Sequence, residues 1–113
     1  MSQFEKKLAE MGVNLPEAPA PAANYVPYVQ AGDMLFVSGQ IAKDGDTLLT
    51  GKLGADLDVA DGAKAARACA IALLAQVKAA CGGDLGKHAR AAVSSPSLPF
   101  GVAVEIDGVF QIK

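Results

Sequence analysis

The sequence contains no tryptophan, only one histidine and two cysteines, and aromatic residues make up 5% of its 113 residues. One histidine and two poorly spaced cysteines cannot supply the four ligands of a structural zinc site, so we expect no metal. Hydrophobic residues nevertheless make up 51% of the chain. Because alanine dominates them, we expect a core built by close backbone packing. The length is typical of one domain, and we expect residues 1–113 to form a single domain.

Clusters of basic residues are also lacking. The net charge is −2, the isoelectric point is about 5.2, and Lys6-Lys7 is the one adjacent basic pair. Proteins that bind nucleic acids usually carry a basic patch, so we expect no nucleic-acid partner. The longest apolar run is too short to span a membrane, and charges in residues 1–11 exclude the core of a signal peptide. We therefore expect a cytoplasmic protein with no membrane partner.

The two cysteines, Cys69 and Cys81, fall within or at the end of one predicted helix. Twelve residues of helix separate them by about 18 Å, which is too far for a disulfide. We interpret both as small apolar residues in a reducing compartment.

The first quarter of the chain predicts a short helix followed by an extended segment. In residues 1–12 an apolar stripe is formed by Phe4, Leu8 and Met11, at the spacing of one helix face. Such a narrow stripe indicates docking on the main body of the domain. Residues 13–27 contain four prolines, so we expect this segment, called the strap below, to lie extended over the surface.

Strands joined by turns are predicted to follow. Residues 28–30 form a short strand, and residues 34–37 form an uninterrupted apolar run that predicts a strand buried on both faces. Residues 43–46 have the composition of a turn, and a short strand over residues 47–49 follows it.

The most strongly predicted element is a helix from Val59 to Ala80. Asp58 can cap its N-terminus, and Lys78 near its end favours the helix dipole. An apolar stripe expected to face the sheet is formed by Ala66, Ala70, Leu73 and Val77.

The chain ends in strands, and the last strand alternates between two faces. Val102, Val104 and Ile106 are predicted to face the long helix. The opposite face carries Ala103, Glu105 and Asp107, so it should not be ordinary core.

Four side chains are candidates for chemistry. Arg90 begins a predicted strand and needs an anionic partner, which is either the carboxylate of a ligand or a structural salt-bridge partner such as Glu105. Glu105 either lies on a solvated face or holds a water molecule for reaction. Tyr28 either closes over a small ligand or packs with its hydroxyl at the surface. Ser38 precedes a glycine at a strand end and has the position of a turn residue.

Taken together, these segments resemble the RidA/YjgF family of reactive-intermediate (enamine/imine) deaminases, formerly called the endoribonuclease L-PSP family. The stretch "PYVQAGDMLFVSGQIAKDG" resembles the N-terminal hairpin of that family. The stretch "HARAAVSSPSLPFGVAVEIDGVF" resembles its C-terminal signature, which is an arginine before a small-small-Val run, then Leu-Pro, then a strand with Val-Glu. "LAEMGVNLPEAPAPAANYVP" is similar to a longer subgroup with a leading helix.

The resemblance implies an α+β fold of the chorismate-mutase type, a mixed sheet packed against helices, assembled as a trimeric barrel with ligand clefts between subunits. The implied chemistry is the hydrolysis of enamines and imines, such as 2-aminoacrylate, to 2-keto acids and ammonia without a cofactor. By motif position, Arg90 binds the substrate carboxylate and Glu105 positions the attacking water. Tyr28, Ser38 and Gly39 line the cleft.

Two other functions remain open. A protein of the same fold can bind small carboxylates without turnover. An endoribonuclease, as the older family name has it, is disfavoured by the acidic isoelectric point and the missing basic groove.

Between Lys87 and His88 the sequence differs from the pattern of the family that it resembles. The family has a further strand and a second helix before the arginine strand, which together take about 25–40 residues. Removal of both would expose a large apolar area, at about 25 cal/mol per Å², in a domain of only about 5–15 kcal/mol net stability. We therefore expect that a segment is missing from the sequence here. The stretch "SSPSLP" also differs from the usual pattern of the family.

Overall fold

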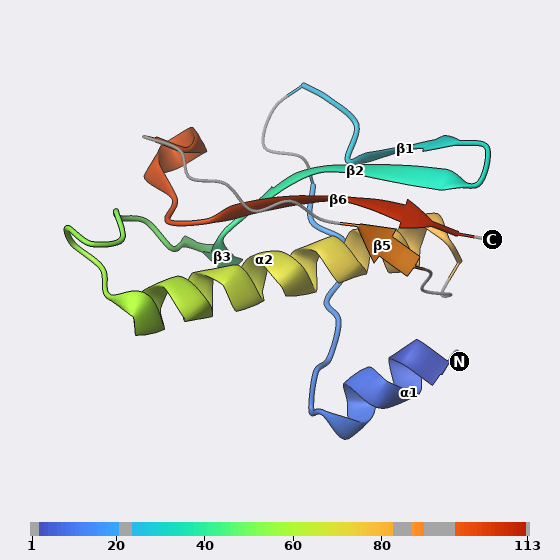
Figure 1. Ribbon diagram of the computed structural model, residues 1–113, viewed down its shortest axis with the longest axis horizontal. Helices are drawn as coiled ribbons and strands as arrows, with labels where there is room; N and C mark the ends of the chain where they lie inside the picture. The colour runs from blue at the N-terminus through green and yellow to red at the C-terminus, as the bar shows by residue number, and fades with distance from the viewer. Residues whose placement is uncertain (1–2, 21–23, 83–86, 90–96, 113) are drawn as a thin grey trace.

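The structure is a computed structural model that describes residues 3–20, 24–82, 87–89 and 97–112. The α+β fold class is confirmed (Figure 1). The helices are α1 (Gln3–Glu10), α2 (Val59–Ala80) and the short 3₁₀ helix η1 (Pro99–Gly101). The strands are β1 (Tyr28–Ala31), β2 (Met34–Ile41), β3 (Lys43–Asp44), β4 (Thr47–Leu48), β5 (Lys87–Ala89) and β6 (Glu105–Gln111).

One four-stranded sheet carries the fold, in the order β1-β2-β6-β5, and β3 and β4 form a separate small hairpin. All three pairings described in the large sheet are antiparallel. The mixed character that the family resemblance implies is thus not seen among the described strands, because β5 joins the sheet antiparallel to β6. Helix α2 lies along one face of the sheet, and α1 lies beyond α2 on the same side (Figure 1).

Strand β2 is buried on one face only. Leu35 and Val37 are 0% and 4% exposed, whereas Met34 and Phe36 are 38% and 48% exposed. The prediction that residues 34–37 are buried on both faces is therefore wrong for this chain. The reason is that α2 covers one side of the sheet, and no described element covers the other, which we call the outer face.

Helix α2 begins and ends where the sequence predicts. Its N-terminal cap is a complete capping box, in which the side chain of Asp58 accepts from Asp61 N–H and the side chain of Asp61 accepts from Asp58 N–H. The predicted stripe is wrong by one residue in the first half, because Ala65 and Cys69, rather than their neighbours Ala66 and Ala70, are fully buried against the sheet. In the second half, Val77 is buried as predicted.

The last strand starts later than the alternating pattern indicates. The turn of η1 precedes it, and Phe100 within that turn has a left-handed backbone with φ of 57°. Val102 is buried and bridges to Thr50 outside the main sheet, and Ala103 packs against the same apolar cluster as Val104 and Ile106. Regular alternation between two faces therefore begins only at Glu105.

Helix α1 contacts the body of the protein through Leu8, which packs against the main core, while Phe4 and Met11 are 43% and 64% exposed. From α1, the strap runs back toward the sheet (Figure 1). The side-chain amide of Gln76 on α2 donates to Pro19 O at 2.6 Å and holds the strap against the helix.

Strand β5 runs through the junction at which we expect a missing segment. Lys87 and His88 are consecutive residues of this strand and pair with Gln111 and Phe110 of β6. The strand predicted from Arg90 onward lies outside the described residues, and the missing segment stays a prediction. Among the described residues, no helix is long and apolar enough to cross a bilayer.

The Asp58 cap gives the first testable prediction. Hydrogen bonds, chiefly from Asp61 N–H, lower the pKa of Asp58 from its ordinary value of 3.8. Asp58→Ala should therefore lower Tm by a few degrees at neutral pH, since one N-terminal N–H loses its acceptor. Because the pKa is lower in the folded state, the contribution of the ionised carboxylate is present above about pH 4 and is lost as the pH falls through the folded pKa.

Thermal melts of the wild type, Asp58→Ala and Asp58→Asn as a function of pH check this expectation. Asparagine still accepts a hydrogen bond but does not titrate, so the Asn variant should keep most of the stability at neutral pH. A deficit of the Ala variant that is equally large in acid would contradict the role of the ionised cap.

Candidate functional site

The candidate site is organised by a β-bulge in β2. Val37 pairs with Gly108 and Gln40 pairs with Ile106, so two residues of β2, Ser38 and Gly39, lie opposite a single residue of β6. Bulges of this kind redirect side chains and are common next to active sites. Here the extra residue leaves Val37 and Gln40 both on the helix side of the sheet.

Glu105 and Gly39 are in direct contact on the outer face. A Cβ atom placed on Gly39 would lie 2.8 Å from Cδ and 3.0 Å from Oε2 of Glu105. Glycine is therefore needed here because the side chain of Glu105 occupies the space where another side chain would start. The half-buried side chain of Glu105 thus lies against the bulge.

Ser38 has a structural contact of its own. Its backbone N–H and its hydroxyl both donate to Pro27 O, at 3.0 and 2.9 Å. This pair of hydrogen bonds attaches the end of the strap to the bulge. The structure thus places Ser38 in the bulge beside Gly39, which contacts Glu105, and the Ser38 hydroxyl donates to the backbone.

Tyr28 lies elsewhere in a single chain. It is the register partner of Val37 and packs against the core cluster of Leu35, Val37, Val77 and Phe110, on the side that α2 covers. The ring of Tyr28 therefore lies on the opposite side of the sheet from Glu105. Arg90 lies outside the described residues, and the sequence motif alone supports its proposed role.

Sequence reasoning missed a buried amide network behind the bulge. Gln40 and Gln76 are 8% and 1% exposed. The side-chain amide of Gln40 donates to Ser38 O at 3.0 Å, and its oxygen accepts from the amide of Gln76 at 3.4 Å. Gln76 also donates to Pro19 O. The one available signal was a glutamine inside the apolar run of the long helix, since a buried polar group needs partners.

Cys69 lies beneath the strand that carries Glu105. Its thiol donates to Val104 O at 3.4 Å, and burial, together with the nearby charge of Glu105, raises the pKa of Cys69 to about 12. A thiol with this pKa is protonated at neutral pH and is a poor nucleophile. The interpretation of Cys69 as a small buried residue fits this environment.

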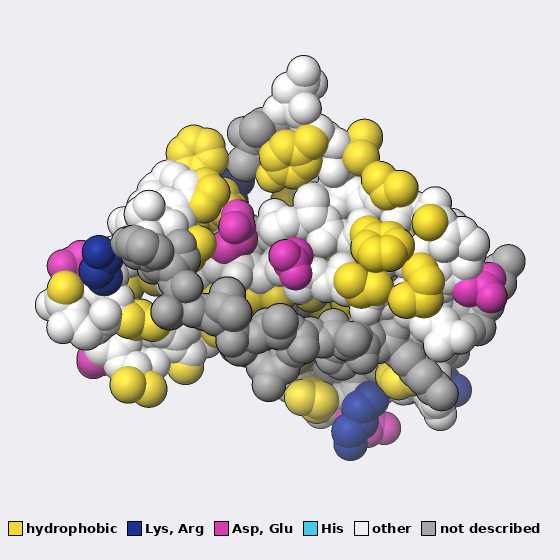
Figure 2. All heavy atoms as spheres, turned by 45° about the horizontal axis from the view of Figure 1, so that its top comes forward, with side chains coloured by type: hydrophobic (Ala, Val, Ile, Leu, Met, Phe, Trp, Pro, Cys, Tyr) yellow, Lys and Arg dark blue, Asp and Glu magenta, His cyan; other side chains and the backbone are white. Residues whose placement is uncertain are grey.

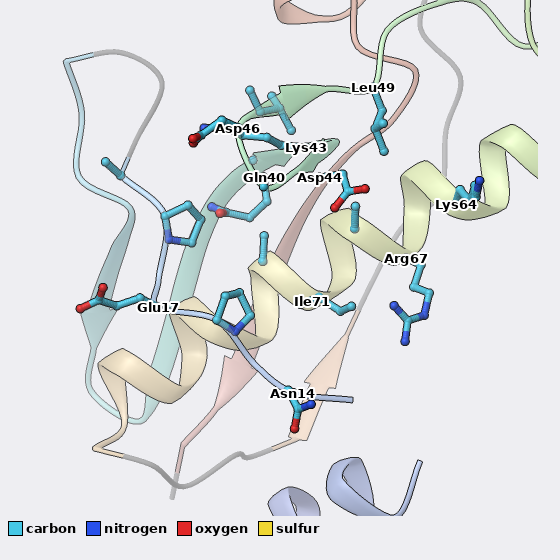
Figure 3. A pocket seen from close by; sticks show the side chains of 18 of the residues that line it. Asn14, Glu17, Gln40, Lys43, Asp44, Asp46, Leu49, Lys64, Arg67 and Ile71 are labelled. Carbon is cyan, nitrogen blue, oxygen red and sulfur yellow. The ribbon is translucent and has the colours of Figure 1, made fainter. Parts of the chain in front are cut away.

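A cavity of about 1050 Å³ lies on the helix side, between the strap, α2 and the β3–β4 hairpin (Figure 3). Lys64 and Arg67 project from α2, and Lys43 and Asp44 come from the hairpin (Figure 3). The backbone of Gly39 belongs to its wall, but Glu105 does not. This cavity is therefore distinct from the outer-face site, although both touch the bulge.

The outer face carries an apolar patch beside the carboxylate. Val29, Met34 and Phe36 are exposed there, and Val29 and Val109 flank Phe36 in the register of the sheet. Figure 2 shows hydrophobic side chains gathered over β1 and β2, with acidic side chains next to them over the first part of β6. The face thus combines a hydrophobic surface with a half-buried carboxylate. Such a face can bind a small polar ligand if another surface covers it.

Comparisons with known proteins agree on one family. Residues 5–92 match a family model described as "YjgF/chorismate_mutase-like, putative endoribonuclease". Protein TCP17 of Trypanosoma cruzi is 36% identical, and the alignment covers 94% of this chain and 92% of that protein. That alignment is 147 residues long, so the relative carries residues that this chain of 113 lacks.

Two crystal structures are similar over nearly the whole chain. Atu1372 of Agrobacterium tumefaciens, described as a protein of unknown function, has a TM-score of 0.83 at 34% identity and covers 97% of this chain and 93% of its own. A protein of Shewanella oneidensis, described as a "putative endoribonuclease", has a TM-score of 0.84 at 25% identity and covers 95% of this chain and 97% of its own.

The Gly39–Glu105 contact gives the second prediction. Gly39→Ala should destabilise the protein by about 1 kcal/mol, at the low end of overpacking costs, because the clash is with the movable end of a side chain. In the Glu105→Ala background the same substitution should cost almost nothing. Denaturant unfolding of the two single variants and the double variant measures this coupling. Equal costs in both backgrounds would show that the two side-chain positions are independent.

Proposed function

The chain belongs to the YjgF/chorismate-mutase-like family, and we propose that it hydrolyses enamines and imines of the 2-aminoacrylate type to 2-keto acids and ammonia. The observation that carries this proposal is the carboxylate of Glu105, which is half-buried and lies against Gly39 on a partly apolar sheet face. A carboxylate in this position can orient a water molecule toward an electrophilic carbon.

In the proposed reaction, the enamine first takes a proton on carbon and becomes the imine. Glu105 orients water for attack on the imine carbon, and the resulting carbinolamine loses ammonia to give the 2-keto acid. Arg90 binds the carboxylate of the substrate with its planar guanidinium, which suits two parallel hydrogen bonds. This role of Arg90 is supported by its place in the C-terminal sequence motif.

We further propose that the site is completed in a homotrimer, with the cleft between subunits on the outer face. The exposed patch of Val29, Met34 and Phe36 supports this proposal, because apolar surface of this kind favours association. A covered face would exclude bulk water and strengthen the electrostatic interactions of Glu105. Tyr28 and Ser38 remain proposed cleft residues by motif position.

The two other functions predict different behaviour. A binding protein would be stabilised by 2-keto acids without ammonia release. An endoribonuclease, the activity in the family description, would cleave RNA; the net charge of −2 does not favour a polyanionic substrate.

The third prediction is catalytic. The purified protein should speed the release of ammonia and pyruvate from 2-aminoacrylate that a dehydratase generates in the assay, above the rate without it. Glu105→Gln should lower kcat/KM by roughly 10²- to 10⁴-fold, the range for a group that acts in proton transfer. Arg90→Ala should raise KM, since the substrate carboxylate loses its partner.

Asp33→Asn, an exposed change in the β1–β2 turn, is the matched control and should keep the wild-type rate. Full activity of Arg90→Ala would rule out the carboxylate role of Arg90. Stabilisation by pyruvate with no ammonia release would favour the binding protein. RNA cleavage that persists in a variant lacking both Arg90 and Glu105 would indicate a contaminant.

The fourth prediction concerns assembly. Light scattering should give a mass of three 11.5 kDa chains, and Phe36→Asp should shift the protein to smaller species and lower its activity. Val59→Asp is the control, because Val59 is 88% exposed at the start of α2 and lies outside the outer face. A wild-type monomer with full activity would contradict the intersubunit cleft.

A further inference from the structure

The cavity on the helix side of the sheet takes no part in the proposed reaction. It lies between the strap, α2 and the β3–β4 hairpin, and its volume is about 1050 Å³ (Figure 3). That volume is at the upper end of the range for pockets that bind small organic ligands. Three partly buried apolar side chains belong to its lining, namely Leu49, Ala68 and Ile71. A ligand with an apolar part can therefore cover them and remove their exposed surface from water.

A buried amide belongs to the sheet side of the cavity. Gln40 is part of the lining and is 8% exposed (Figure 3). Its amide nitrogen donates to Ser38 O, and its oxygen accepts from the amide of Gln76. A carboxamide has two N–H groups and two acceptor lone pairs, so Gln40 can bond a ligand while it keeps both of these contacts.

The charged side chains of the lining are separated by sign. The α2 part of the lining carries two charges, both positive, on Lys64 and Arg67, which are neighbours on the helix surface because they are three residues apart. The other walls carry more acidic than basic residues, namely Glu17 from the strap and Lys43, Asp44 and Asp46 from the hairpin. Figure 3 shows the guanidinium of Arg67 on the α2 side and the carboxylate of Asp44 on the hairpin side. The cavity thus has a positive side and a negative side.

This distribution of charge favours a zwitterion over an ion of one sign. A polyanion would meet the acidic side of the cavity, and a polyamine would meet Lys64 and Arg67. A ligand with a carboxylate at one end and an ammonium group at the other gains charge-assisted hydrogen bonds at both ends. A free amino acid would fill only a small part of the volume, whereas a peptide of a few residues fills more of it and adds amide groups for Gln40 to bond.

We propose that this cavity is a second binding site, which takes a short peptide with free termini. Arg67 binds the carboxylate of the peptide, Asp44 binds its ammonium group, and Gln40 bonds a backbone amide. The planar guanidinium of Arg67 suits two parallel hydrogen bonds to a carboxylate. The site is independent of the proposed function, because it uses neither Glu105 nor Arg90.

The fifth prediction uses trialanine, whose small apolar side chains suit the lining, as the probe for the full chain. Trialanine should raise Tm as its concentration rises and should bind saturably in calorimetry. N-acetyl-trialanine, which lacks the ammonium group, and trialanine amide, which lacks the carboxylate, should each bind about tenfold more weakly.

Two variants assign the two ends of the peptide. Arg67→Gln should weaken trialanine about tenfold and leave the binding of trialanine amide almost unchanged, because that peptide has no carboxylate to lose. Asp44→Asn should weaken trialanine to a similar degree and leave N-acetyl-trialanine almost unchanged. Asp33→Asn, an exposed change outside the cavity, is the matched control and should bind all three peptides as the wild type does.

A wild-type protein that shows no saturable binding of trialanine at millimolar concentrations would overturn the site. Equal binding of the free and the blocked peptides would overturn the roles of Arg67 and Asp44, and so would variants that weaken all three peptides alike. Pyruvate binding that is tighter than trialanine binding and is weakened by Arg67→Gln would show a site for simple anions instead. None of these measurements uses imine turnover, so this site and the proposed function can fail separately.

Discussion

The extra residue in β2 at Ser38–Gly39 is the constraint on which the rest of the structure depends. A one-residue shift in an antiparallel register moves every later side chain to the other face. The bulge confines that shift to one place, so Val37 on one side of it and Gln40 on the other both point toward α2. The same geometry leaves Glu105 on the outer face.

The bulge is stabilised by polar contacts that also position the strap. Gln40 and Gln76 satisfy the carbonyls of Ser38 and Pro19, and Ser38 holds Pro27 near the other end of the strap. A buried polar group that loses its hydrogen-bond partner lowers the stability of the fold by about 1–3 kcal/mol. Loss of one of these contacts should therefore lower the stability by more than the net contribution of a single hydrogen bond, because its partner would be left buried and unsatisfied. The strap therefore helps to stabilise the bulge. Pro27 O accepts a hydrogen bond from Ser38, and Pro19 O accepts one from Gln76, which is itself bonded to Gln40.

A structural feature can be predicted from this sequence when the residues that determine it are close together in the chain. Asp58 and Asp61 are three residues apart and form a capping box, so the limits of α2 follow from the sequence. The buried face of α2 does not, because Ala65 and Ala66 are equally small, and only the sheet decides which of them is covered. The burial of β2 likewise depends on what lies on each side of it. The bulge depends on the register between residues about seventy positions apart, and Glu105 could be singled out only as a carboxylate in an apolar strand.

The proposed chemistry and the proposed assembly both depend on the one face of the sheet that no described element covers. A carboxylate surrounded by water keeps its own hydration shell and gains little by orienting one particular water molecule. For its proposed role, Glu105 therefore needs a second surface that excludes bulk water. The exposed apolar side chains that favour binding of such a surface, such as Phe36 and Met34, lie on the same face as the carboxylate. In the proposed trimer, a second copy that buries this patch would lower the local dielectric around Glu105 and strengthen its electrostatic interactions with the substrate and the attacking water. Association and the chemistry of Glu105 are thus coupled in the proposed trimer, because burial of the apolar patch also encloses the carboxylate.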